Sequence, residues 1–394
     1  MPIALPLEEL RSWIRLSLEP GLGPAQARNL LAAAGLPHAI YASSAGALGK
    51  LLPADLAGQL KREPDEALQR AIDGAVKWLE HPGHHLLTLA DPAYPPSLLD
   101  THDPPLLLYV NGDPAYLSRP LISVVGARSA TAGGMDNARS FSRHLAEQGW
   151  CIGSGLAQGI DTAAHEGALL AGPDGGSTVA VLGTGIDIVY PAKNRELAHR
   201  IAAHGALVSE FPVGARALPH HFPRRNRVVA GLARGVLVVE AAKQSGSLIT
   251  ARLASEMGRE VFAIPGSIHS PLSRGCHALI RQGAKLVESA QDIQEELGRP
   301  GPRPAARGAQ GSLSDTARPQ GAGGALGALA SAAGQVQELI LNALGYDPVH
   351  LDALQQRSRL DLPTLTGGLL DLELSDLVVR HDDGRFQRRH RKDD

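Results

Sequence analysis

Short apolar runs alternate with segments of helical periodicity between about residues 106 and 298. The runs are rich in valine, isoleucine and leucine and lie at residues 122–125, 151–153, 178–182, 207–210, 236–240, 261–264 and 285–287. Such alternation predicts an α/β domain in which a parallel sheet is covered by helices on both faces. Ligands of these sheets bind beyond the carboxyl ends of the strands, so the residues that follow each run are the candidates for function.

The first of these runs leads directly into Gly126-Ala127-Arg128, and a helical pattern follows at residues 133–147. This order predicts a buried strand, a tight turn and a helix N-terminus. Unpaired backbone N–H groups and the helix dipole favour an anion at such a turn, and the guanidinium of Arg128 suits a phosphate. The alternative is an ordinary strand-to-helix turn that carries a surface arginine.

Further turns rich in glycine and serine follow the other predicted strands. They contain Gly155, Gly159, Gly183, Gly185, Lys193, Asn194, Lys243, Ser245, Gly246, Ser247, Pro265 and Gly266. In a parallel sheet these turns meet at one edge, where they would present several backbone donors to phosphate groups. We therefore expect an anionic ligand at this edge.

A basic stretch between the fourth and fifth predicted strands, residues 211–239, holds five arginines and no acidic residue. The arginines are Arg216, Arg224, Arg225, Arg227 and Arg234, with His220, His221, Phe222 and Asn226 among them. Positive charge for the backbone and flat rings for the bases are what single-stranded nucleic acid requires. The alternative is a solvated basic helix face with one buried arginine.

Catalytic and cofactor motifs are poorly represented. Asp161 and Asp187 are better explained as a helix N-cap and a turn residue than as a catalytic pair, and Ser154 lies outside a Gly-x-Ser-x-Gly elbow. Ser245 and Ser247 are placed to cap the next helix. The chain shows neither a Gly-x-Gly-x-x-Gly turn nor a Walker motif. We predict no catalytic residue, no cofactor and no metal.

Composition narrows the class of protein. The 394 residues suggest two or three domains, and the formal net charge of −2 restricts any nucleic-acid surface to a local patch. The two cysteines, Cys151 and Cys276, lack metal-ligand spacing and favour a reducing compartment. Residues 1–18 do not resemble a signal peptide, and no apolar run is long enough for a membrane span. We expect a cytoplasmic protein without membrane partners.

Two smaller domains are expected on either side of the sheet domain (residues 86–298). Residues 1–85 show helical patterns at 7–18, 45–60 and 65–79, and the turn Pro20-Gly21-Leu22-Gly23-Pro24 resembles a helix-hairpin-helix (SAM-like) element. Such a turn can offer backbone N–H groups to a phosphate; a plain helical hairpin is the alternative.

At the other end, residues 299–333 have the composition of a flexible linker. Residues 334–394 predict a winged helix, with helices at 336–344, 349–356 and 364–372 and a hairpin at 377–388. The would-be recognition helix lacks lysine and arginine between residues 361 and 379 and carries acidic residues instead, which argues against duplex reading. For the basic residues at 388–392 we favour disorder.

Ordered motifs across residues 90–297 resemble the DNA-processing protein A family (DprA, also called Smf). They are Val125-Gly126-Ala127-Arg128, residues 155–161, residues 183–187, Tyr190-Pro191-Ala192-Lys193-Asn194, residues 209–212, Phe222-Pro223-Arg224-Arg225-Asn226-Arg227, residues 245–251, residues 258–266 and residues 279–284. The resemblance implies an extended Rossmann-like domain that binds single-stranded DNA as a homodimer. It also implies that the protein protects incoming DNA in natural transformation and loads the RecA recombinase.

Turns and motifs together predict one set of DNA-binding residues. The set is Gly126, Arg128, Gly155, Gly159, Lys193, Asn194, Arg224, Arg225, Asn226, Arg227, Lys243, Ser245, Gly246 and Ser247. The family pattern assigns Arg128 to phosphate and Lys193 to a second basic contact. Some relatives have lysine where this chain has Ala242, and Lys243 comes one position later. The rival hypothesis is a Rossmann-like enzyme that acts on nucleotide phosphates, similar to phosphoribohydrolases, although the glutamate of that motif is missing.

Overall fold

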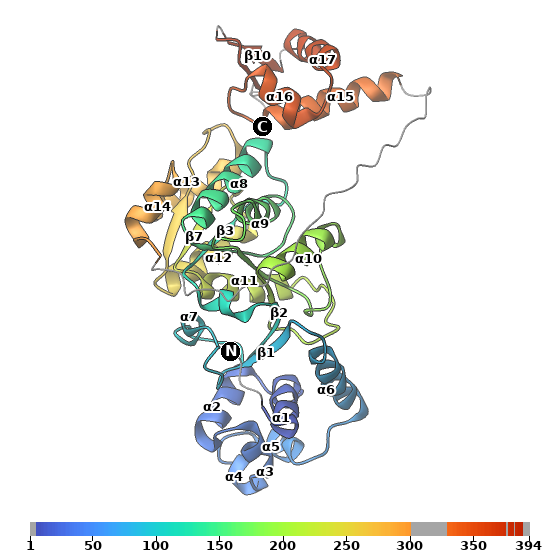
Figure 1. Cartoon of the computed structure of the whole chain (residues 1–394), viewed down its shortest axis with the longest axis vertical. Coiled ribbons are helices and arrows are strands. Elements are labelled where there is room, and N and C mark those ends of the chain that lie inside the picture. Colours follow the sequence, from blue (N-terminus) through green and yellow to red (C-terminus); the bar gives the residue numbers. More distant parts are fainter. Residues whose placement is uncertain (1–4, 301–328, 376, 382, 389–394) are drawn as a thin grey trace. The chain divides into compact units, whose positions relative to one another are not determined.

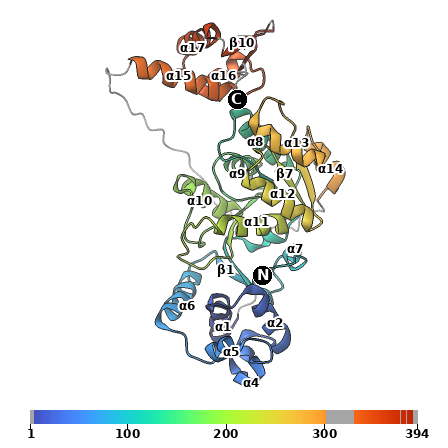
Figure 2. The same cartoon turned by 180° about the vertical axis from the view of Figure 1, so that it is seen from behind.

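The computed structural model describes residues 5–300, 329–375, 377–381 and 383–388 (Figure 1; Figure 2 shows the opposite side). The chain divides into two compact units, Met1–Ala130 with Gly134–Pro300 and Thr131–Gly133 with Gly301–Asp394. We call the first the N-terminal unit; it contains a helical domain (residues 5–79) and a sheet domain (residues 84–300). The described part of the second unit, residues 329–388, is the C-terminal domain. Most of the predicted linker at 299–333 lies outside the described residues.

One sheet of nine strands forms the centre of the sheet domain, in the order β1-β2-β6-β5-β4-β3-β7-β8-β9 among the described residues. The strands are β1 His84–Thr88, β2 Leu107–Gly112, β3 Leu121–Val125, β4 Cys151–Ser154, β5 Thr178–Val181, β6 Ala206–Ser209, β7 Gly235–Val238, β8 Glu260–Ala263 and β9 Lys285–Leu286. The seven predicted strands are confirmed and pair in parallel. The sheet is not wholly parallel, because β1 and β2, which the sequence pattern did not predict as strands, add antiparallel pairs at one edge.

Alternate residues of β3 face opposite helical layers, which explains its unbroken apolar run. Leu121 and Val125 pack in a cluster that includes α11 (His221–Leu232) and α12 (Gly246–Glu256). Ile122 and Val124 pack in a second cluster with α8 (Ala132–Glu147) and α9 (Ile160–Leu170). The remaining elements of this domain are α7 Pro96–Leu99, η1 Pro114–Ser118, η2 Ala192–Asn194, α10 Arg195–His204, η3 Pro271–Ser273, α13 Arg274–Arg281 and α14 Ala290–Leu297.

The helical domain contains α1 Leu7–Leu18, α2 Pro24–Ala34, α3 Pro37–Ala42, α4 Ala45–Leu48, α5 Ala54–Leu60 and α6 Glu66–Leu79. The single helix predicted at 45–60 is wrong, because α4 ends at Gly49 and Pro53 starts a new helix as its N-cap. In the hairpin turn, the Gln26 side chain accepts a hydrogen bond from the Gly23 N–H at 2.9 Å, and Gln59 donates to the Pro20 carbonyl at 2.9 Å. These polar groups of the turn are therefore used within the domain, as in a plain helical hairpin.

The C-terminal domain has the predicted order of three helices and a hairpin. Its elements are α15 Leu329–Leu344, α16 Leu351–Ser358, α17 Leu362–Leu374, β10 Val378–Arg380 and β11 Phe386–Arg388. Helix α15 begins inside the segment predicted as linker. Leu344, Leu354, Leu369 and Phe386 form part of a core of its own. Among the described residues of both units, every helix is too short or too polar to cross a lipid bilayer.

Candidate nucleic-acid interface

A pocket of about 640 Å³ opens at the carboxyl ends of β3 and β7. The strand order reverses between these two strands, and this is where parallel sheets bind ligands. The pocket is lined by Val125, Gly126, Arg128, Ala157, Asp161, Tyr190, Pro219, Phe222, Pro223, Arg225, Asn226, Ser245, Gly246, Ser247, Ile249 and Thr250. Segments that follow five strands, β3 to β7, and the first turns of α11 and α12 thus meet at the predicted edge.

The turn after β3 is packed so closely that it needs glycine. A Cβ on Gly126 would lie 2.6 Å from Ile160 Cγ1, and one on Gly159, which has φ +75°, would lie 2.3 Å from the Ala127 carbonyl oxygen. The Ala127 N–H also donates to the Glu240 carbonyl at 2.7 Å. This packing fixes the backbone, while the side chain of Arg128 remains exposed at the pocket.

Two aromatic rings stand beside Arg128. The ring centroids of Tyr190 and Phe222 are 5.6 Å apart with 47° between the planes, and the guanidinium carbon of Arg128 is 5.5 Å from the Phe222 centroid. Tyr190 is 50% exposed and lines the cavity, so it is accessible to a ligand there. A cation beside exposed rings suits a chain of phosphates and bases.

Helix α12 begins at the opposite wall. Ser245 is its N-cap and its Oγ accepts a hydrogen bond from the Ser247 N–H at 3.3 Å, which confirms the capping role predicted for Ser245. The same role predicted for Ser247 is wrong, because Ser247 lies within the helix. Gly246, Ser247, Ile249 and Thr250 from the first turns line the pocket. The positive end of the helix dipole therefore lies next to the cavity and favours an anion there.

Two buried residues of opposite charge, Arg225 and Asp161, attract each other and support the pocket from inside. Arg225 is 5% exposed and donates through Nη1 to the carbonyls of Gly155, at 2.5 Å, and Val181. Asp161 Oδ2 accepts from the N–H groups of Gly155 and Ala157 at 3.1 and 3.3 Å. Burial lowers the pKa of Arg225 to about 10, so this residue stays charged at neutral pH, and burial raises the pKa of Asp161 against the attraction of Arg225.

Two sequence interpretations are revised here. Asp161 is not the N-cap of α9, because Gly159 holds that position and Asp161 lies in the first helical turn. Gly155 does not line the cavity; a Cβ there would lie 2.1 Å from Arg225 Nη1, so its role is to admit the guanidinium. Asp161 thus lines the cavity, and Gly155 lies behind the lining.

Half of the fourteen predicted residues line the pocket, namely Gly126, Arg128, Arg225, Asn226, Ser245, Gly246 and Ser247. Asn194 is buried and donates to the Leu156 carbonyl at 2.9 Å and to Thr162 Oγ1 at 3.0 Å, so it holds a loop in place. Lys193 and Lys243 are exposed and lie outside the lining.

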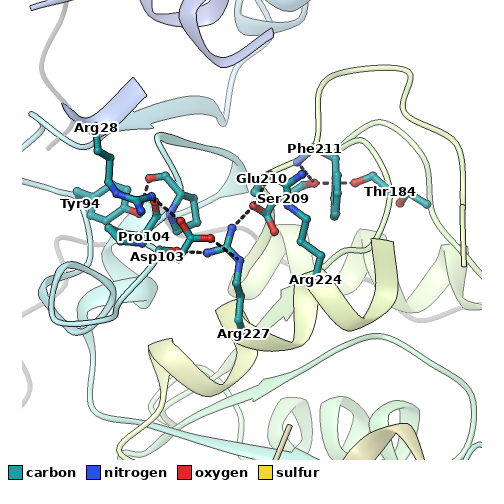
Figure 3. Close-up of polar contacts among 11 residues, drawn as sticks. Arg28, Tyr94, Asp103, Pro104, Thr184, Ser209, Glu210, Phe211, Arg224 and Arg227 are labelled. Atoms are coloured by element: carbon teal, nitrogen blue, oxygen red, sulfur yellow. Dashed lines mark hydrogen bonds and ion pairs between the residues drawn. The ribbon is translucent and has the colours of Figure 1, made fainter. Parts of the chain in front are cut away.

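Arg224 and Arg227 also lie outside the lining. They project from another side of α11 and pair with Glu210, as Figure 3 shows.

Sequence reasoning did not select Tyr190 or Ile249, although both are exposed and line the pocket. Tyr190 stood in a recognised motif, but only its basic and amide neighbours were chosen. An exposed ring next to a glycine-rich turn is the signal that could have identified it.

Two family models match the chain. The model of DNA recombination-mediator protein A matches residues 85–298, which is more than half of the chain, and the DprA winged helix domain matches residues 326–384. The chain belongs to the DprA family. This confirms the resemblance seen in the motifs and the winged-helix nature of the C-terminal domain.

Individual relatives agree with this membership. The chain is 44% identical over 246 residues to the DNA processing protein DprA of Streptococcus pneumoniae, covering 62% of this chain and 85% of that protein. It is 47% identical over 230 residues to Protein Smf of Escherichia coli, covering 58% of this chain and 61% of that protein. The X-ray structure of the Streptococcus pneumoniae DprA matches with a TM-score of 0.63 and 37% identity, over 75% of this chain and 99% of that one.

Proposed function

We propose that the pocket between β3 and β7 binds single-stranded DNA. The observation that carries the proposal is the meeting of Arg128, the Tyr190–Phe222 ring pair and the N-terminus of α12 around one cavity. The arginine and the helix end suit phosphates, and the rings suit unstacked bases. Paired bases would not be available to these rings.

A structure from the same family supports this choice of ligand. The DNA processing protein A of Helicobacter pylori, described for its unique single-stranded DNA binding mode, matches with a TM-score of 0.50 and 29% identity over 55% of this chain and 96% of that one. The proposed biological role is the one that the family resemblance implies. The chain would act as a homodimer in the cytoplasm, protect incoming single-stranded DNA during natural transformation and load the RecA recombinase on it.

The geometry favours binding over catalysis on a nucleotide. Asp161 is the acidic residue among the described pocket-lining residues, and its carboxylate accepts two backbone N–H groups and faces Arg225. Both N–H groups bond to Oδ2, so this carboxylate helps to hold the turn that forms the wall of the pocket.

A salt-titrated binding assay on the full-length protein tests the proposal. We expect tight binding to an oligo(dT) strand, weaker binding to a duplex of equal length, and a log–log salt slope that grows by about 0.7 for each phosphate neutralised. Release of free base from a panel of nucleotides would support the phosphoribohydrolase-like alternative. Equal affinity for single strands and duplexes would contradict the role given to the rings.

A further inference from the structure

Helix α11 presents two faces with different partners. Phe222, Arg225 and Asn226 lie on the face that lines the pocket. Arg224 and Arg227 project from another side, because successive residues of an α-helix are turned by about 100°. The stretch that looked uniformly basic in the sequence is thus divided into a pocket face and a face that carries ion pairs.

Glu210 receives both arginines of the second face (Figure 3). Its side chain is 3% exposed, and its Oε2 pairs with Arg227 Nη2 and, at 3.2 Å, with Arg224 Nη2. The backbone next to it is also anchored, since Ser209 Oγ donates to the Thr184 carbonyl at 2.6 Å and accepts from the Phe211 N–H at 3.0 Å. A buried carboxylate is strongly destabilising without its cation, so Arg227 cannot leave this position easily.

Asp103 extends the network to the helical domain. Its backbone carbonyl accepts from Arg227 Nη1, and its Oδ2 lies 3.7 Å from Arg227 Nε. Its Oδ1 accepts from Arg28 Nη1 at 2.5 Å, and Arg28 also donates to the Pro104 carbonyl at 3.2 Å. Arg28 belongs to α2, so a continuous chain of contacts runs from the helical domain through Asp103 to α11 (Figure 3).

We propose that Arg28, Asp103, Arg227 and Glu210 position α11 for DNA binding, so that the helical domain controls the geometry of the pocket without touching the DNA. This inference rests on the proposed function. Arg227 is then a positioning residue, although its motif identifies it as a candidate DNA contact. The rings and cations on the pocket face keep their spacing because the other face is held at both Glu210 and Asp103.

The test measures the affinity of the full-length protein for oligo(dT) as a function of salt. The variants are Arg227→Gln, Arg28→Gln, the double variant, and Arg128→Ala as a direct pocket contact. Arg252→Gln is the matched control, because it removes the same charge from an exposed pair on α12, where the Arg252 side chain is 81% exposed. Unfolding curves recorded by tryptophan fluorescence confirm that each variant is folded.

We expect Arg227→Gln to weaken binding by about tenfold with an unchanged salt slope, because a loosened support misplaces contacts without removing one. Arg28→Gln should weaken binding by about threefold, and the double variant should bind no worse than Arg227→Gln alone, since both act through Asp103. Arg252→Gln should bind like the parent protein.

Two outcomes would overturn the inference while leaving the proposed function intact. Parent-like affinity of folded Arg28→Gln and Arg227→Gln, with Arg128→Ala impaired, would show that the network does not influence the pocket. A salt slope lowered by about 0.7 in Arg227→Gln would identify a direct phosphate contact instead.

If Arg227→Gln fails to fold, Arg28→Gln and Asp103→Asn decide the question. Parent-like binding by Arg128→Ala would count against the proposed function itself.

Discussion

Two helices in this chain lie at positions from which related folds contact nucleic acids. They differ in the residues that surround them. Helix α12 begins at a cavity that also holds Arg128, Tyr190 and Phe222. Helix α17 occupies the recognition position of the winged helix, and its exposed residues include Leu370, at 56%, and Leu374, at 79%. The first suits an anion and the second does not.

The charges next to α17 strengthen the contrast. Asp361 caps the helix by accepting from the Thr364 N–H at 2.8 Å, and the exposed Asp371 and Glu373 follow. Carboxylates repel a phosphate backbone, so the fold of a winged helix does not by itself supply a DNA-binding surface. The comparison teaches that, in this chain, the local residues and not the domain type indicate where DNA binds.

The largest expected effect comes from Arg225. Replacement by methionine leaves the carbonyls of Gly155 and Val181 without their donor and removes the positive charge that attracts the buried Asp161, so we expect the N-terminal unit to lose about 3–5 kcal/mol of unfolding free energy. Urea unfolding followed by tryptophan fluorescence measures this, since all three tryptophans, Trp13, Trp78 and Trp150, lie in that unit. Arg252→Met is the exposed control and should change stability by less than about 0.5 kcal/mol. Equal curves for both variants would show that the buried contacts of Arg225 are not needed for stability.

Removal of the exposed pocket cation should affect binding and leave stability unchanged. For Arg128→Ala we expect a loss of about 2–3 kcal/mol in binding free energy, which is the range for hydrogen bonds to charged groups. The salt slope should fall by about 0.7. Filter binding or fluorescence anisotropy at several salt concentrations measures both quantities. A weaker affinity with an unchanged slope would mean that Arg128 does not reach a phosphate.

A pH effect is expected from the buried His165 of α9. Burial lowers the pKa of His165 to about 3, and its Nδ1 lies 2.7 Å from Thr178 Oγ1. In the unfolded chain the imidazole of His165 takes up a proton below about pH 6.5, whereas in the folded chain it remains neutral. The free energy of unfolding is therefore unaffected by His165 above about pH 6.5. Below that pH it declines, and at pH 5 the loss due to His165 is about 2 kcal/mol.

The variant His165→Gln tests whether His165 causes this pH dependence, because glutamine can donate a hydrogen bond to Thr178 without titrating. We expect the loss of stability between pH 7 and pH 5 to shrink by about 2 kcal/mol in this variant, as measured by urea unfolding at each pH. An unchanged pH dependence would assign the acid sensitivity to other groups.

The smallest expected effect concerns α17. The double variant Asp371→Asn, Glu373→Gln removes two exposed negative charges from the C-terminal domain. If single-stranded DNA binds at the sheet edge, the affinity for oligo(dT) should change by less than about twofold at physiological salt, because salt screens exposed charges that do not contact the strand. A clear gain in affinity would place the bound strand close to α17. It would contradict the conclusion that α12, and not α17, lies at the binding site.

The sequence predicted the parallel strands because the apolar runs of β3 to β7 are wholly buried, a pattern that an unbroken apolar run reveals. The antiparallel strands β1 and β2 were missed, since proline-rich neighbours concealed them and their partners lie far along the chain. The α4–α5 break was missed because two short helices share one apolar pattern.

The residues of the candidate site could also be predicted only in part from the sequence. Gly126, Arg128 and the Ser245–Ser247 turn could be located from their positions after the strands. The division of the arginines on α11 could not, because it depends on Glu210 and Asp103, whose contacts only the folded chain reveals.

Photo-crosslinking of oligo(dT) to the full-length protein, followed by mapping of the modified peptides, tests most directly whether the pocket holds the bases. We predict crosslinks at Tyr190 and Phe222, whose rings line the cavity, and their loss in Arg128→Ala at moderate salt. Crosslinks confined to α17 or to the β10–β11 hairpin, with none at the two rings, would contradict the account.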